Sequence, residues 1–167
     1  MLPPVAGGYL AAVLLLGGAG AAKLRRPDDT AGALRVAGLP SRPGLVRVGA
    51  SAELAVAIAA FTARGPWPAV LVAVSYGSFT VFVATALTRS WPIASCGCFA
   101  RPDTPPALSH LLLDLAATGA AIWWAIAAPA WWWPQLFRQA GHGTPLLLLT
   151  VALATVAYLL FTRSPVH

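Results

Sequence analysis

Charged side chains are scarce in this chain. Aspartate, glutamate, lysine and arginine together make up 10% of its 167 residues, while hydrophobic residues make up 58%. A soluble domain carries about 25% charged residues, so this composition cannot cover a water-facing surface. Lipid must therefore surround much of the chain, and we predict a multi-pass protein of the cell membrane.

Several kinds of site also lack the residues that they need. The sequence has no glycine-rich phosphate loop, no zinc-type spacing of cysteine and histidine, and no interleaving of aromatic with basic residues. The net charge is +6, but the basic residues cluster between apolar runs, which is typical of membrane orientation. We therefore expect no metal site and no nucleic-acid partner, and we expect contact with membrane lipid.

Long apolar stretches divide the chain into expected membrane helices. Four of them reach the roughly 17–25 residues that a spanning helix needs, and they lie at residues 5–22, 45–63, 69–87 and 108–128. A signal peptide is the alternative for the first stretch, but no lysine or arginine precedes it. A shorter fifth run, at 145–161, just spans the hydrocarbon core at about 1.5 Å per residue.

A more polar segment lies between the first two spans. Asp28-Asp29-Thr30 can cap a short helix, and Gly38-Leu39-Pro40 stops it. We expect residues 28–37 to form an amphipathic helix at the membrane surface, and a solvated loop is the alternative. The predicted fold class is all-α: a membrane four-helix bundle with an interfacial helix between the first two spans and an extra C-terminal transmembrane helix. Residues 1–130 would form the bundle, and residues 131–167 a loop and the last helix.

The alternation of the spans sorts the remaining residues by side. Lys23, residues 28–37 and the loop at 89–106 belong to one surface. The opposite surface collects tryptophans, which prefer the headgroup layer, and we predict an aromatic belt formed by Trp67, Trp123, Trp124, Trp131, Trp132 and Trp133.

The only two cysteines of the chain, Cys96 and Cys98, lie one residue apart in the loop at 89–106. A bridge across Gly97 would be strained and easily reduced, and the glycine would tolerate the tight ring. A structural staple is disfavoured, because so short a loop gains almost no stability. We predict a redox pair, with inert thiols and metal ligands as the alternatives.

Three ionisable residues lie inside the apolar spans on the cysteine side: Glu53, His110 and Asp114. Acids in membrane helices normally face the bundle interior and find a partner, and His110 and Asp114 share a helical face. The three are candidates for a proton relay or for orienting the thiols. The alternative is structural pairing of Glu53 or Asp114 with Lys23 or Arg89. A quinone is a candidate cofactor, with tryptophan and phenylalanine shaping its pocket, although membrane anchoring is the other role for these side chains.

These features resemble the MauE family of methylamine-utilisation membrane proteins, within the wider DoxX-like group. The resemblance covers about residues 5–128 and rests on Ala22-Lys23-Leu24, Gly38-Leu39-Pro40, Glu53 and Cys96-Gly97-Cys98-Phe99. The family usually continues with glycine, whereas Ala100 follows here. The resemblance implies a redox-associated membrane protein that works with a thioredoxin-like partner in maturing disulfide-containing proteins. It does not imply a role in methylamine metabolism.

Two functional hypotheses follow, and one question of sidedness stays open. The first hypothesis is a thiol–disulfide oxidoreductase that exchanges electrons with a thioredoxin-like protein, and the alternative is a non-catalytic membrane scaffold that stabilises a partner enzyme.

Nine lysines and arginines lie on the cysteine side and two on the other, which predicts cytoplasmic cysteines. Disulfide formation instead favours the outer face.

Overall fold

The computed structural model describes residues 5–93, 105–127 and 143–162, together with Pro134, Leu136 and Arg138. Every regular element of this part of the chain is a helix, which confirms the predicted all-α class. The six helices of the described residues are α1 (Val5–Arg25), α2 (Pro27–Val36), α3 (Pro43–Thr62), α4 (Trp67–Thr88), α5 (Leu108–Ala127) and α7 (Thr144–Thr162).

Proline and glycine mark the helix boundaries. Pro27 and Pro43 stand at the first positions of α2 and α3, where a fixed φ suits the helix and a missing N–H costs nothing. Gly38 follows α2 with φ at 73°, and Gly65 lies between α3 and α4 with φ at 87°, a conformation that glycine adopts without strain. The predicted ends of the helices therefore agree with the structure to within a few residues.

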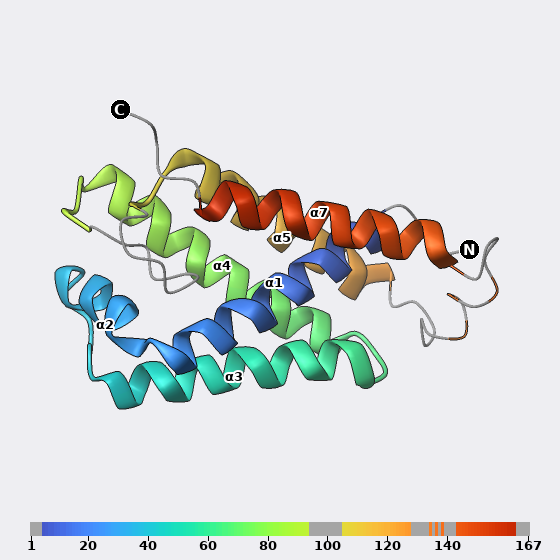
Figure 1. The fold of residues 1–167 in the computed structure, drawn as a ribbon, viewed down its shortest axis with the longest axis horizontal. Coiled ribbons are helices and arrows are strands. Elements are labelled where there is room, and N and C mark those ends of the chain that lie inside the picture. Colours follow the sequence, from blue (N-terminus) through green and yellow to red (C-terminus); the bar gives the residue numbers. More distant parts are fainter. Residues whose placement is uncertain are drawn as a thin grey trace.

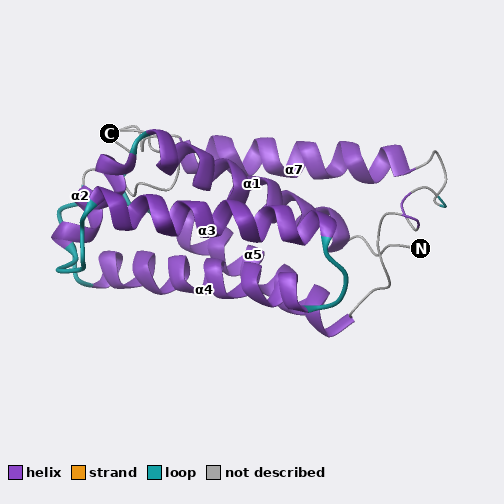
Figure 2. Ribbon diagram, turned by 90° about the horizontal axis from the view of Figure 1, so that it is seen from below, coloured by secondary structure: helices purple, strands orange, loops and turns teal. Residues whose placement is uncertain are grey.

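The long helices run together along the longest axis of the molecule, and α2 lies across one end of them (Figures 1 and 2). Helix α1 is central, because it packs along α3 and α7 and also contacts α5. Helix α4 packs along α5 and contacts α3, which completes the bundle. The end of α1, the start of α3, the end of α4 and the start of α5 therefore meet at the end covered by α2.

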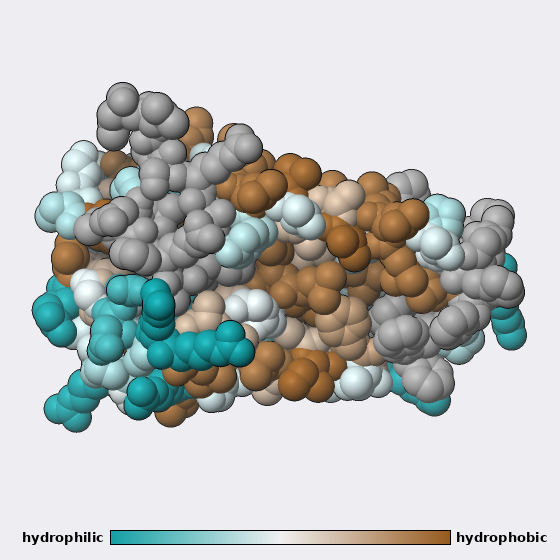
Figure 3. All heavy atoms as spheres, in the orientation of Figure 1, coloured by the Kyte–Doolittle hydropathy of each residue, from teal (hydrophilic) through white to brown (hydrophobic). Residues whose placement is uncertain are grey.

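In the part of the chain that the structure describes, four helices are long and apolar enough to cross a membrane, namely α1, α3, α4 and α5. Their outward faces carry exposed large hydrophobic side chains such as Val48, Val74 and Ile126. Hydrophobic atoms cover the middle of the molecule, and hydrophilic atoms gather at the α2 end (Figure 3). The predicted fifth span corresponds to α7, which is a shorter apolar helix and is not one of the four.

Small residues bring α1 close to its neighbours. A Cβ on Gly20 would lie 2.8 Å from the carbonyl oxygen of Ala50, so the backbones of α1 and α3 touch at this position. Such close approach is typical of helix packing in membranes, where the hydrophobic effect does not drive helices together. Small residues there let the backbones come into van der Waals contact. The crossing fixes the relative register of α1 and α3, and with it the site described next.

The predicted tryptophan belt is partly wrong. Trp124 is buried at 6% exposure and stacks on Tyr9 with 4.8 Å between ring centroids, so it belongs to the core between α5 and α1. Trp67 and Trp123 are exposed, as a belt requires. Trp131, Trp132 and Trp133 lie outside the described residues.

Candidate functional site

A buried ion pair joins α1 to α3. The ammonium of Lys23, in the last turn of α1, donates to both carboxylate oxygens of Glu53, at 2.7 Å and 2.9 Å. The side chains of Lys23 and Glu53 are only 7% and 14% exposed. A charged hydrogen bond of this length is among the strong ones. The structure therefore selects, among the partners considered for Glu53, the lysine that ends α1.

The close crossing of α1 and α3 explains why these two residues meet. The Cβ of Glu53 is 3.3 Å from the position that a Cβ on Gly20 would take, so Glu53 faces α1 one turn before Lys23. Glu53 also lies halfway along α3, about 15 Å from the start of the helix. A carboxylate at this depth of a membrane helix needs a partner inside the bundle, and Lys23 supplies it.

Helix α4 closes the ion pair from a third direction. The ammonium of Lys23 lies over the ring of Phe79, 4.5 Å from the ring centroid. A cation over an aromatic face is stabilised by the ring quadrupole, more strongly where water is excluded. Phe79 does not stand out in the sequence, because a phenylalanine in an apolar run carries no signal of its own.

Helix α5 adds the two other ionisable residues. His110 and Asp114 are each 2% exposed, so both face the bundle interior, as the cost of placing an acid in lipid predicts. Among the described residues, none hydrogen-bonds to the buried Oδ2 atom of Asp114. A second buried carboxyl group, on α5, therefore lies inside the bundle besides that of Glu53 on α3.

His110 is held at the start of α5. The backbone N–H of Ala107 donates to its Nδ1 at 3.0 Å, which satisfies one of the free amides at the helix start. A nitrogen that accepts a hydrogen bond carries no proton, so the neutral ring has its proton on Nε2. The histidine is therefore fixed in one tautomer, with Nε2 as its donor.

The cysteine pair lies outside the described residues, as does Gly97. The described residues that precede it pack against α2: Ile93 is buried together with Ala33 and Ala86, and Phe82 and Trp91 cover this cluster. The chain thus enters the cysteine loop beside α2, at the end of the bundle where α5 begins. In the part of the chain that the structure describes, no group of three histidine, cysteine, aspartate or glutamate residues could hold a metal ion.

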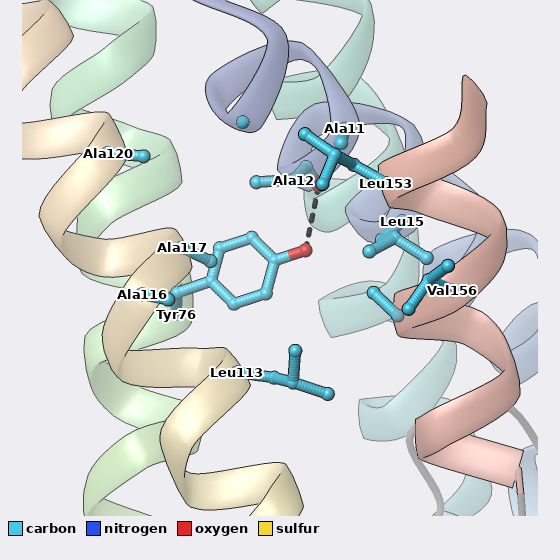
Figure 4. Close-up of a pocket in the computed structure, with 12 residues that line it drawn as sticks. Ala11, Ala12, Leu15, Tyr76, Leu113, Ala116, Ala117, Ala120, Leu153 and Val156 are labelled. Atoms are coloured by element: carbon cyan, nitrogen blue, oxygen red, sulfur yellow. Dashed lines mark hydrogen bonds between the residues drawn. The ribbon is translucent and has the colours of Figure 1, made fainter. Parts of the chain in front are cut away.

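Several cavities open between the described helices. A small one, about 200 Å³, lies between α1, α4, α5 and α7, and its one polar side chain is Tyr76. The hydroxyl of Tyr76 points to α1 and donates to the carbonyl of Ala12 at 2.7 Å (Figure 4). This cavity and another of about 430 Å³ between α1 and α7 therefore offer little chemistry beyond an apolar surface. A larger cavity, about 460 Å³, has Lys23 and Glu53 in its wall.

A comparison with protein families identifies the chain. A family model described as methylamine utilisation protein MauE matches residues 2–128, which include α1 to α5 and the cysteine loop. No curated protein and no solved structure matches the chain. With four helices able to cross a membrane and this match over most of its length, the chain belongs to the MauE family of methylamine utilisation membrane proteins.

Proposed function

We propose that this protein exchanges electrons with a thioredoxin-like partner through Cys96 and Cys98. The observation that carries the proposal is the sequence Cys96-Gly97-Cys98, which holds both cysteines of a chain that belongs to the MauE family. The pair stands in the loop between α4 and α5, whose described start packs beside α2. A loop at the end of a membrane bundle is within reach of a soluble protein.

The proposed reaction is an exchange of two thiols for one disulfide. A thiolate of the reduced pair attacks the disulfide of the partner, which forms a mixed disulfide and releases one partner thiol. The second cysteine then attacks the mixed disulfide, which closes the Cys96–Cys98 bridge and releases the partner as a dithiol. The two electrons run in the opposite direction when the partner starts as the dithiol and the pair as the disulfide.

Buried polar residues near this end support the same proposal. Thiol exchange needs a thiolate, and the attacking sulfur has to lose a proton first. His110, with its donor at Nε2, and Asp114, whose Oδ2 has no hydrogen-bond partner among the described residues, lie in the first two turns of the helix that follows the loop. We propose that the carboxylate of Asp114 takes up this proton, that the Nε2–H of His110 orients the thiols, and that Glu53 keeps Lys23 in place.

We also propose where α2 and α7 lie relative to the membrane. We infer that α2 lies at the interface, because its Ala31 and Ala33 are buried while Asp28 and Arg35 are exposed. We also infer that α7 crosses the membrane beside α1, where Leu149 packs within 3.1 Å of the Cβ position of Gly7. Residues 131–167 would then extend a bundle that ends near residue 130.

Trapping of the mixed disulfide tests the proposal. Replacing one cysteine, in Cys96→Ser or Cys98→Ser, removes the second attack, so one of the two variants should accumulate a mixed disulfide with a thioredoxin-like protein. The double variant is the matched control and should trap nothing. If neither single variant traps a partner and the double variant keeps full function in cells, the protein is a scaffold and the redox proposal is wrong.

Sidedness and redox state can be read in the same cells. An impermeant thiol reagent labels the cysteines of intact cells only when they face outward, and labelling that requires prior reduction shows that they are bridged. Outward-facing, bridged cysteines agree with disulfide formation. Cytoplasmic cysteines would agree with the nine positive charges on that side.

A further inference from the structure

The larger cavity has the composition of a ligand site. Its volume of about 460 Å³ lies between α2, α3 and α4, and Lys23 of α1 reaches into its wall. Small-molecule sites in proteins are mostly apolar clefts of about 300–1,000 Å³ with a few polar groups that fix the orientation of the ligand. Most of this wall is apolar, and its charged side chains are Lys23 and Glu53.

The ion pair limits the charge of the ligand. Lys23 and Glu53 neutralise each other at 2.7 Å, so the wall offers no net charge to a phosphate or to a cation. It does offer a donor and an acceptor: an ammonium has three N–H groups, of which two bond to Glu53, and a carboxylate has more acceptor sites than those two bonds use. The complementary ligand is neutral and has an oxygen that can accept or donate a hydrogen bond.

The remaining wall limits the shape of the ligand and the phase that it comes from. Phe79 and Phe82 of α4 supply aromatic surface next to the ammonium, which suits a flat ring. Leu39 and Leu45, on the rim between α2 and α3, are 48% and 52% exposed. An apolar rim on a membrane bundle opens toward lipid, so the ligand is soluble in the bilayer.

We propose that this cavity binds the ring of a neutral, lipid-soluble quinone, with Lys23 donating to a ring oxygen, Glu53 accepting from the reduced form, and Phe79 and Phe82 against the ring. As the electron acceptor, the quinone would take two electrons and two protons from the thiols of Cys96 and Cys98, which would form the Cys96–Cys98 disulfide and a quinol. This step rests on the proposed function, whereas binding of the quinone does not. Binding is therefore measured on the Cys96→Ser, Cys98→Ser protein, so that failure of the site and failure of the thiol chemistry can be told apart.

Two glycines of α3 make a matched pair of steric probes. A Cβ on Gly49 or on Gly44 would meet nothing within 4 Å, and both residues are exposed. Gly49 lines the cavity and Gly44 does not. Gly49→Phe should therefore obstruct the cavity without disturbing the helices, and Gly44→Phe should add the same side chain elsewhere. Lys23→Met combined with Glu53→Gln removes the charges and leaves the space open.

The experiment is a titration with decylubiquinone of the protein in lipid nanodiscs, followed by quenching of tryptophan fluorescence. The ring centroids of Trp91 and Phe82 are 6.0 Å apart, and Phe82 lines the cavity, so the fluorescence of Trp91 reports on its occupant. We expect saturable quenching, weakened at least tenfold by Gly49→Phe and by the double charge variant and unchanged by Gly44→Phe. Size-exclusion chromatography checks that each variant is folded. If the double charge variant does not fold, the result with Gly49→Phe alone decides whether the quinone binds in this cavity.

Four outcomes would overturn the proposal. Equal binding by all variants would place the quinone outside this cavity. Loss in Gly49→Phe with normal binding in the charge variant would mean that the cavity holds an apolar chain rather than an oxygen-bearing ring. Loss in the charge variant with normal binding in Gly49→Phe would separate the ion pair from the cavity. Displacement of decylubiquinone by an equal concentration of palmitate would identify a lipid acyl site.

Discussion

Replacing Lys23 by methionine tests how much the buried ion pair contributes to the bundle. Methionine keeps most of the length of the lysine side chain, so the change mainly removes the charge and leaves Glu53 without its partner at 2.7 Å and 2.9 Å. Breaking a buried pair by removing one member costs about 3–5 kcal/mol, because the remaining charge is buried and uncompensated. The loss corresponds to about a 10²- to 10⁴-fold fall in the folding equilibrium constant.

The double variant measures how much of the stability depends on Lys23 and Glu53 being present together. In Lys23→Met with Glu53→Gln no charge remains in the pair, and we expect most of the loss to be recovered, because a neutral replacement of a buried ion pair is often close to neutral in stability. The double-mutant cycle should give a coupling energy of at least about 1.5 kcal/mol. Arg25→Met is the control in the same turn of α1, since Arg25 is exposed, and it should cost less than about 0.5 kcal/mol.

Stability is measured as the fraction of folded protein against the mole fraction of denaturing detergent in mixed micelles, followed by circular dichroism. A coupling energy below about 0.5 kcal/mol would mean that Lys23 and Glu53 do not depend on each other. A Lys23→Met variant as stable as the Arg25→Met control would refute the reasoning altogether.

Three smaller changes test other contacts. Gly20→Ala should destabilise the bundle by about 1–3 kcal/mol, because its Cβ would lie 2.8 Å from the Ala50 carbonyl, whereas Gly8→Ala, in open space on the same helix, should be neutral or stabilising; equal effects would contradict the close crossing. Tyr76→Phe should cost about 1 kcal/mol through its lost hydrogen bond to α1, and no loss would show that the bond contributes nothing. Asp114→Asn should change the stability by less than about 1 kcal/mol, because its Oδ2 has no hydrogen-bond partner among the described residues, and slow disulfide transfer; an unchanged rate would limit Asp114 to a structural role.

Most of the fold could be predicted from the sequence, because each helix is set by local properties. Apolar runs of spanning length define α1, α3, α4 and α5, and prolines and glycines at their ends determine where they start and stop. Helix α2 was predicted at residues 28–37 and is confirmed to within one residue at each end. The expected cap at Asp28 to Thr30 is wrong, because the N-cap residue is Arg26, with no side-chain cap hydrogen bond, and Asp28 and Asp29 lie in the first turn, where they suit the helix dipole. Even the end of the bundle that gathers Lys23, Glu53, His110 and Asp114 follows from the alternation of the spans.

The pairing of the site residues could not be predicted, because it depends on how the helices cross. The sequence left both Lys23 and Arg89 as candidate partners of the two acids. The close contact of Gly20 with Ala50 sets how α1 crosses α3, and this crossing pairs Lys23 with Glu53. Trp124 was expected at the membrane surface, yet the rotation of α5 against α1 buries it on Tyr9.

The cysteine pair and the larger cavity show most clearly what the sequence determines and what only the tertiary structure decides. Cys96 and Cys98 stand out in the sequence because no other cysteine exists and one residue separates them, so the proposed chemistry depends on composition alone. The cavity is formed by side chains of the four successive helices α1 to α4, and its Phe79 and Phe82 carry no signal in an apolar run. Only the packing of α2, α3 and α4 around Lys23 brings those side chains to one place, because enclosed volume is a property of helices in contact and not of any one helix.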